Sequence, residues 1–240
     1  MGRPPSTTRP VGLFCGLAVV DVIQLVQAPP GPDDKIVALD QLIAAGGPAT
    51  NAAVAFAALG GRATLAAPIG AGPLAELVRA DLAGTGVELL DCSDRSGGSD
   101  GAGPAPGLSV SSCTITAGTG RRSVISTNAR AAVDTAPLDR YVARAACGQE
   151  TPPDVVLIDG HNPALARAAL DLAARVGALT VMDAGSWKDP AADLPARCDV
   201  VAASARFYPP GPAGPVTAPQ DVARWLLDAG ARGVVVTRGE

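Results

Sequence analysis

The stretch that decides the fold is Gly46–Gly61, which has the sequence GGPATNAAVAFAALGG. Its opening glycine pair lets the backbone approach closely whatever lies in front of it. Pro48 suits the first position of a helix, where a missing N–H costs nothing, and the closing glycine pair can end that helix. Apart from Thr50 and Asn51, positions 49–59 are apolar nearly all round, which predicts a buried helix rather than a surface helix.

The first turn of this predicted helix would combine free backbone N–H groups, a positive dipole end and the amide side chain of Asn51. Such an end suits a hydroxylated or anionic ligand. Short glycine signatures also occur by chance, so the spacing alone leaves open an ordinary helix start with a polar first turn.

The run before this stretch, residues 11–20, is continuously apolar (VGLFCGLAVV) and is typical of a fully buried strand in a parallel sheet. Asp21 follows it directly. Open α/β sheets bind ligands at the carboxyl ends of such strands, so Asp21 is a candidate ligand-binding carboxylate, with a simple turn residue as the alternative. Short apolar segments at 22–28 and 36–44, separated by a Pro- and Gly-rich turn, predict a small β-flap.

The rest of the chain alternates between predicted strands and helices. Strands are expected at 63–67, 87–90, 154–158, 178–182, 199–202 and 233–236, and helices at 73–83, 137–146, 163–176 and 219–229. Segments 108–117 and 123–127 predict a hairpin, and 94–107 a loop or disordered insert. This alternation implies a parallel sheet covered on both faces, with His161, Asp183, Ser204 and Thr237 gathered along the edge where its strands end.

Composition narrows the class of protein. The chain has 240 residues, 48% hydrophobic and 18% charged, which is enough apolar material for a substantial core. A net charge of −4 gives no electrostatic case for nucleic acid, and no apolar run is long enough to predict a membrane span. The polar, Pro-rich residues 1–10 predict a disordered leader without a signal peptide. Five scattered cysteines and a single histidine favour reduced thiols in a cytoplasmic protein over disulfides or zinc.

The glycine pair followed by Asn51 resembles the N-terminal signature of the ribokinase-like (PfkB-type) sugar and nucleoside kinases, and the resemblance spans roughly residues 11–240. It implies a three-layer α/β/α sandwich with a mainly parallel sheet and a small β-lid, formed by strands at about 22–44 and 108–127. The implied substrate-binding residues are Asp21, Gly46, Gly47, Asn51 and His161. A lone histidine is more often a packing residue, which is the alternative for His161.

The resemblance also implies ATP and Mg²⁺ as cofactors, with Ser204, Thr237 and Gly239 beside the nucleotide. Two departures from the family pattern stand out. Ser204 and Phe207 occupy the positions of the family's Asn-x-x-Glu motif, and neither can replace a carboxylate as a ligand for a hard cation, so no metal ligand is predicted. The family's catalytic Gly-Ala-Gly-Asp turn does not occur before Glu240. We therefore expect the chain to be C-terminally incomplete, with its catalytic base beyond Glu240, or to have lost kinase chemistry.

The predicted function is ATP-dependent phosphoryl transfer to a hydroxyl of a sugar or related small molecule, with the chain as given expected to be inactive. The alternative is a non-catalytic sugar- or nucleoside-binding protein of the same fold. A nicotinamide dehydrogenase is disfavoured, because no G-x-G-x-x-G follows the first strand. The resemblance further implies a homodimer that pairs through the lid. The sequence does not separate a sugar substrate from a nucleoside.

Overall fold

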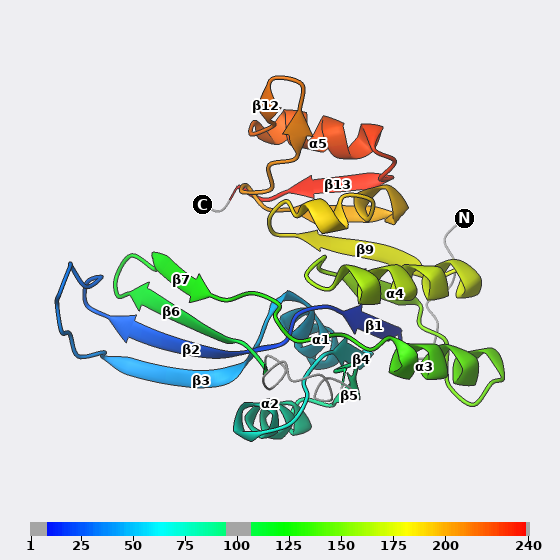
Figure 1. Ribbon diagram of the computed structural model, residues 1–240, viewed down its shortest axis with the longest axis horizontal. Helices are drawn as coiled ribbons and strands as arrows, with labels where there is room; N and C mark the ends of the chain where they lie inside the picture. Colours follow the sequence, from blue (N-terminus) through cyan, green and yellow to red (C-terminus); the bar gives the residue numbers. More distant parts are fainter. Residues whose placement is uncertain (1–8, 95–106, 239–240) are drawn as a thin grey trace, which may run out of the picture.

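The computed structural model describes residues 9–94 and 107–238, and within them seven parallel strands form the main sheet (Figure 1). The strand order is β13-β10-β9-β8-β1-β4-β5. These strands are β1 (Val11–Cys15), β4 (Arg62–Ala67), β5 (Val87–Asp91), β8 (Val155–Ile158), β9 (Leu179–Ala184), β10 (Val200–Ala203) and β13 (Gly233–Val236). Because the strands are parallel, their carboxyl ends meet along one edge of the sheet.

Helices cover the main sheet on both faces, and each begins with a proline in its first turn, where a missing N–H is harmless. On one face lie α1 (Pro48–Ala58) and α2 (Pro73–Ala83), whose buried residues belong to one apolar cluster with Phe14 and Leu65. On the other face lie α3 (Ala136–Ala146), α4 (Pro163–Val176) and α5 (Pro219–Asp228), whose buried residues belong to one apolar cluster with Leu13 and Val156. The predicted three-layer α/β/α architecture with a parallel sheet is therefore confirmed.

A second, mixed sheet projects from the main body (Figure 1). Four strands of the described part of the chain form it in the order β3-β2-β6-β7, and β2 pairs antiparallel to β3 but parallel to β6. The strands are β2 (Val19–Val26), β3 (Asp40–Gly46), β6 (Val110–Thr116) and β7 (Arg122–Ser126). The predicted hairpin is present, since β6 and β7 pair antiparallel. The sequence did not predict the short pair β11 (Pro210–Gly211) and β12 (Gly214–Pro215) or the 3₁₀ turns Asp189–Ala191 and Pro195–Arg197.

The prediction of one continuous strand over residues 11–20 is wrong. Strand β1 ends at Cys15, the chain bends at Gly16, and β2 starts at Val19 in the second sheet. At this bend Gly16 passes directly against a buried carboxyl group, and a Cβ atom at Gly16 would overlap the side chain of Asp159. Asp21 therefore lies inside β2 and does not follow a strand of the main sheet. An apolar run that crosses from one sheet into another carries no local sign of the break.

The prediction of an all-round buried helix is also wrong for α1. Ala49, Thr50 and Ala53 are buried, but Leu59, just after the helix, is 89% exposed. Helix α1 belongs to an outer layer and contacts β1 and β4 on one side only, so its other side faces outward. Its small, mostly alanine side chains let it pack closely on the sheet without requiring burial all round.

The predicted leader at 1–10 and the predicted insert at 94–107 lie almost wholly outside the described residues. All five cysteines lie within the described residues and are free thiols. Burial raises the pKa of the Cys92 and Cys198 thiols to about 12, so both are held as unreactive thiols at neutral pH. No helix in the described part of the chain is long and apolar enough to cross a membrane.

Candidate functional site

Asp21 and the glycine pair lie against one another. Asp21 sits in β2, opposite Ala44 of β3 and Ser111 of β6. Its carboxylate lies over Gly46 so closely that a Cβ atom at Gly46 would overlap it. Partial burial raises the pKa of Asp21, while a hydrogen bond from the Ser111 side chain acts in the opposite direction. Two of the residues predicted to bind substrate thus meet, although Asp21 reaches this place from a different sheet than predicted.

Gly47 connects this contact to helix α1. Its φ of 103° lies in the region that favours glycine, and a Cβ atom there would overlap the carbonyl of Leu17. The N–H of Asn51 donates to the carbonyl oxygen of Gly47 at 2.9 Å, which closes the first turn of α1. The side chain of Asn51 is exposed. The geometry thus leaves the Asn51 amide free to meet a ligand beside the glycine turn, but it does not test that role.

The sequence analysis did not single out Asp159. This residue directly follows β8, at the edge of the main sheet where the carboxyl ends of its strands meet. Its side chain is 1% exposed. Asp159 Oδ2 accepts hydrogen bonds from the N–H groups of Leu17 (2.7 Å) and Ala49 (3.3 Å), and Oδ1 accepts one from the N–H of His161 (3.0 Å). Asn162 Nδ2 donates to the carbonyl oxygen of Gly16 at 3.0 Å. The only sequence signal for these contacts was the cluster of polar residues after a buried strand.

The charges at the ends of β8 and β9 influence one another. Burial raises the pKa of Asp159, and burial followed by the charge of Asp159 raises the pKa of Asp183. Burial lowers the pKa of Lys188, against the pull of both carboxylates. Burial and then the positive charge of Lys188 lower the pKa of His161 to about 4. At neutral pH the His161 imidazole is therefore uncharged, so it can hydrogen-bond a hydroxyl group but offers no positive charge to a phosphate.

A cavity of about 260 Å³ opens at the carboxyl ends of β9, β10 and β13. It is lined by Leu157, Val181, Asp183, Ala202, Ala203, Ser204 and Thr237. The structure thus brings together Ser204 and Thr237, two of the residues predicted to bind the nucleotide. Their backbones are fixed by the main sheet, since Ser204 N–H donates to Ala184 and Thr237 N–H to Ala203. The third predicted residue, Gly239, lies outside the described residues.

The residues at the Asn-x-x-Glu positions do not fit a magnesium site. Phe207 is 1% exposed and packs edge-on against Trp187, with ring centroids 5.6 Å apart. The Ser204 hydroxyl donates to the carbonyl oxygen of Gly185 at 2.8 Å. Among the residues that the structure describes, no group of three or more His, Cys, Asp or Glu side chains could hold a metal ion. Neither Ser204 nor Phe207 can therefore supply the carboxylate that a hard cation prefers.

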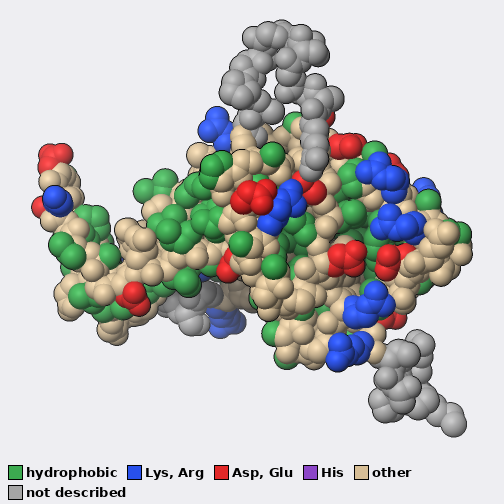
Figure 2. Space-filling view, turned by 90° about the horizontal axis from the view of Figure 1, so that it is seen from below, with side chains coloured by type: hydrophobic (Ala, Val, Ile, Leu, Met, Phe, Trp, Pro, Cys, Tyr) green, Lys and Arg blue, Asp and Glu red, His purple; other side chains and the backbone are tan. Residues whose placement is uncertain are grey.

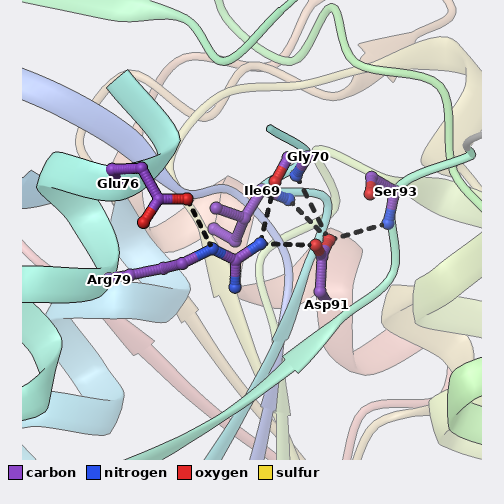
Figure 3. Close-up of polar contacts among 6 residues, drawn as sticks. All are labelled: Ile69, Gly70, Glu76, Arg79, Asp91 and Ser93. Atoms are coloured by element: carbon purple, nitrogen blue, oxygen red, sulfur yellow. Dashed lines mark hydrogen bonds and ion pairs between the residues drawn. The ribbon is translucent and has the colours of Figure 1, made fainter. Parts of the chain in front are cut away.

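A second carboxylate, Asp91, anchors the turn between β4 and α2 (Figure 3). Asp91 Oδ1 accepts from the N–H groups of Ile69 (3.1 Å), Gly70 (3.3 Å) and Ser93 (3.0 Å), and Arg79 binds Oδ2 at 2.7 Å. Burial acts to raise the pKa of Asp91, but the hydrogen bonds, led by that of Arg79, outweigh it and hold the pKa well below its usual range. An ionised carboxylate therefore holds the turn between β4 and α2 in place.

Comparison with known proteins agrees with this architecture. No family model and no curated protein matches the chain. Among solved structures, a microbiome-derived acarbose kinase superposes with a TM-score of 0.71 at 22% identity, covering 97% of this chain and 71% of that one. Arabidopsis thaliana ribokinase, solved with ribose and ATP, gives 0.63 at 15% identity, covering 96% and 72%. The chain has a ribokinase-like fold.

The length of this ribokinase-like chain differs from that of its structural neighbours. It spans 70% of a carbohydrate kinase from Agrobacterium tumefaciens, with a TM-score of 0.63 and 20% identity, and 60% of another protein from that organism. Identities this low establish the fold but assign no residue a role. The roles of Asp21, Gly46, Gly47, Asn51 and His161 in substrate binding therefore stay predictions.

Proposed function

We propose that this chain is the substrate- and nucleotide-binding part of a carbohydrate kinase. The observation that carries the proposal is the contact between the Asp21 carboxylate and Gly46, beside the first turn of α1. On a ribokinase-like fold this contact brings a hydrogen-bond acceptor, a tight glycine turn and a helix N-terminus to one place. Arabidopsis thaliana ribokinase, which shares the fold, was solved with ribose and ATP, and this supports the choice of ligands.

The proposed sugar site uses groups suited to hydroxyls. An ionised Asp21 accepts two hydroxyl hydrogen bonds, the Asn51 amide both donates and accepts, and the neutral His161 adds a further donor or acceptor. The positive dipole end of helix α1 lies beside these groups. None of these groups offers a positive charge to a phosphate, so the proposed substrate is a neutral polyol rather than a phosphorylated one.

The proposed nucleotide site is the cavity beside Ser204 and Thr237. Its apolar wall of Leu157, Val181 and Ala202 suits a flat base, and the two hydroxyl groups can hydrogen-bond a ribose or phosphate. Bound ATP would supply the phosphoryl group for transfer. Magnesium in kinases is commonly held by one or two carboxylates and the phosphates themselves, so the missing metal cluster does not weigh against ATP.

Phosphoryl transfer also needs a group that receives the proton of the sugar hydroxyl. We assign this role to no residue described here, and its predicted location beyond Glu240 stays a prediction. The proposal for residues 9–238 is therefore the binding of sugar and ATP.

The test is isothermal calorimetry of the purified chain with D-ribose, D-fructose and adenosine as titrants, together with a coupled assay for ADP release. Binding of a sugar with ADP release supports a kinase. Sugar binding without ADP release, persisting when the chain is extended past Glu240, supports the non-catalytic alternative. Failure of every titrant to bind, in a chain that is shown to be folded by circular dichroism, would overturn the proposal.

We also propose that the second sheet is a lid over the sugar site and that it pairs with the lid of a second copy. Hydrophobic side chains gather on this projecting part of the molecule (Figure 2). Exposed ones on or near its strands are Val37, Leu39, Leu42, Ile43, Val110, Val124 and Ile125. Exposed apolar patches on a water-soluble surface commonly mark interaction sites. The edge of the sheet offers unpaired backbone groups in addition.

A further inference from the structure

A buried carboxylate lies between the two segments that carry the proposed sugar-binding residues, the segment leading to Asp21 and the start of α1 with Asn51. Asp159 directly follows β8, whose last residue Ile158 pairs with Cys15 at the end of β1. Its side chain is 1% exposed. A fully buried carboxylate is rare in proteins unless every oxygen is hydrogen-bonded, because its charge loses the solvation that water provides.

One oxygen of this carboxylate joins two separate segments. Asp159 Oδ2 accepts from the N–H of Leu17, four residues before Asp21, and from the N–H of Ala49, two residues before Asn51. The donors lie 2.7 and 3.3 Å away. The start of the β2 segment and the start of α1 are thus both attached to the same atom.

Neighbouring contacts reinforce this attachment. Asn162 Nδ2 donates to the carbonyl oxygen of Gly16 at 3.0 Å, and the Thr50 hydroxyl donates to the carbonyl oxygen of Leu17 at 3.2 Å. Gly16 leaves room for the carboxyl group, since a Cβ atom there would overlap Asp159. The bend that follows β1 is therefore held by directional hydrogen bonds, in addition to apolar packing.

We propose that Asp159 is a positioning residue that sets the relative placement of Asp21 and Asn51, without touching the substrate. An apolar residue could fill the same space without the cost of burying a charge, but it could not fix two backbone segments at defined angles. Directional acceptors are what a site of this kind needs, because misplacement of a binding group by about 1 Å weakens its hydrogen bonds. The inference rests on the proposed sugar site.

Asp159→Asn tests the inference, because it keeps the size of the side chain but turns one acceptor oxygen into a donor that faces a backbone N–H. The matched control is Asp154→Asn. Asp154 precedes the same strand at the opposite edge of the sheet, and its Oδ2 accepts from the N–H of Val11 at 2.9 Å. The control breaks a similar carboxylate–backbone bond on the same β8–β1 pair, far from the sugar site.

Two measurements are made on wild type and both variants: the Kd for D-ribose by calorimetry, and hydrogen exchange of peptides that cover Leu17 and Ala49. We expect Asp159→Asn to raise the Kd at least tenfold and to speed exchange at both amides. We expect Asp154→Asn to change the Kd less than twofold and to leave exchange at these amides unaltered. If Asp159→Asn does not fold, Asn162→Ala takes its place. It removes the bond from Asn162 to the carbonyl oxygen of Gly16, so exchange should speed at Leu17, the next residue, and the Kd should rise, while Ala49 keeps its bond to Asp159.

The outcomes separate this inference from the proposed function. Wild-type ribose affinity in Asp159→Asn, or unaltered exchange at Leu17 and Ala49, would overturn it. An equal loss of affinity in both variants would also overturn it, since a general loss of stability would then be enough. If the wild-type chain binds none of the three titrants, the proposed sugar site fails, and the exchange measurement alone decides whether Asp159 holds the two segments. If it binds fructose or adenosine but not ribose, that ligand replaces ribose in the Kd measurement.

Discussion

The carboxylate of Asp21 lies directly over the α-carbon of Gly46, where a side chain of any size would overlap it. The two residues come from neighbouring antiparallel strands, β2 and β3, that are joined by the turn of the projecting sheet. This contact explains why the first glycine of the pair is needed, although its backbone does not adopt a positive φ.

Replacing Gly46 with alanine should therefore move Asp21. We expect Gly46→Ala to cost about 1–3 kcal/mol of unfolding free energy, the usual range for adding a methyl group to a packed site. Sugar affinity should fall as well. Gly107→Ala is the control, because a Cβ atom at Gly107 would meet nothing within 4 Å. Urea unfolding and calorimetry measure the two effects, and equal behaviour of both variants would contradict the contact.

Asn51→Ala separates binding from stability. The Asn51 side chain is exposed, so we expect a change in unfolding free energy of no more than about 0.5 kcal/mol. If Asn51 binds a sugar hydroxyl, affinity should fall by roughly 1–3 kcal/mol, the cost of leaving a polar partner unpaired. Exposed Gln149 provides a control as Gln149→Ala. Unchanged affinity in calorimetry would remove Asn51 from the site.

His161 should make the protein sensitive to acid. Its pKa is lowered from 6.5 to about 4 in the folded chain, so the folded state favours the neutral imidazole. The stability it contributes is fully present above pH 6.5 and is lost as the pH falls toward 4, by up to about 3 kcal/mol. His161→Gln should flatten the curve of unfolding free energy against pH in this window. Parallel curves for wild type and variant would show that the imidazole is not buried as described.

The Arg79 side chain forms two ion pairs, with Asp91 and with Glu76, and we expect them to stabilise the fold unequally. Its bond to Asp91 is 2.7 Å long and partly buried, whereas the contact with Glu76 is 3.8 Å long and the Glu76 side chain is 73% exposed. Arg79→Met should cost about 1–3 kcal/mol, because it removes a charge-assisted hydrogen bond. Glu76→Gln should cost less than about 0.5 kcal/mol. Urea unfolding compares them, and a larger effect of Glu76→Gln would contradict this ranking.

If two copies of the chain pair through the projecting sheet, a charged side chain introduced on that surface should break the dimer. Ile125 is 79% exposed on β7, so Ile125→Lys should shift the protein from dimer to monomer in light scattering after size-exclusion chromatography, without loss of folding. Leu59→Lys is the control, since Leu59 is 89% exposed at the end of α1, outside that sheet. A monomeric wild-type protein would rule out the dimer.

Much of the fold was predictable from local signals. The helices Pro73–Ala83 and Pro163–Val176 and the strand Gly233–Val236 were predicted at their observed bounds. Proline at a helix start and alternating apolar segments act within a few residues of the positions they mark, so no long-range information is needed. The close approach of the backbone at Gly46 and Gly47 was likewise predictable from the glycine pair.

Only the tertiary structure decided how these segments meet. In the structure the apolar run is interrupted after Cys15, Asp21 lies in the second sheet, and the outer side of α1 is exposed. The structure also revealed Asp159, whose bond to Leu17 joins residues 142 positions apart. The physical reason is the sequence separation of the interacting residues. Helix and strand preferences depend on neighbours along the chain, whereas a buried carboxylate meets its hydrogen-bond donors only after distant segments have packed around it.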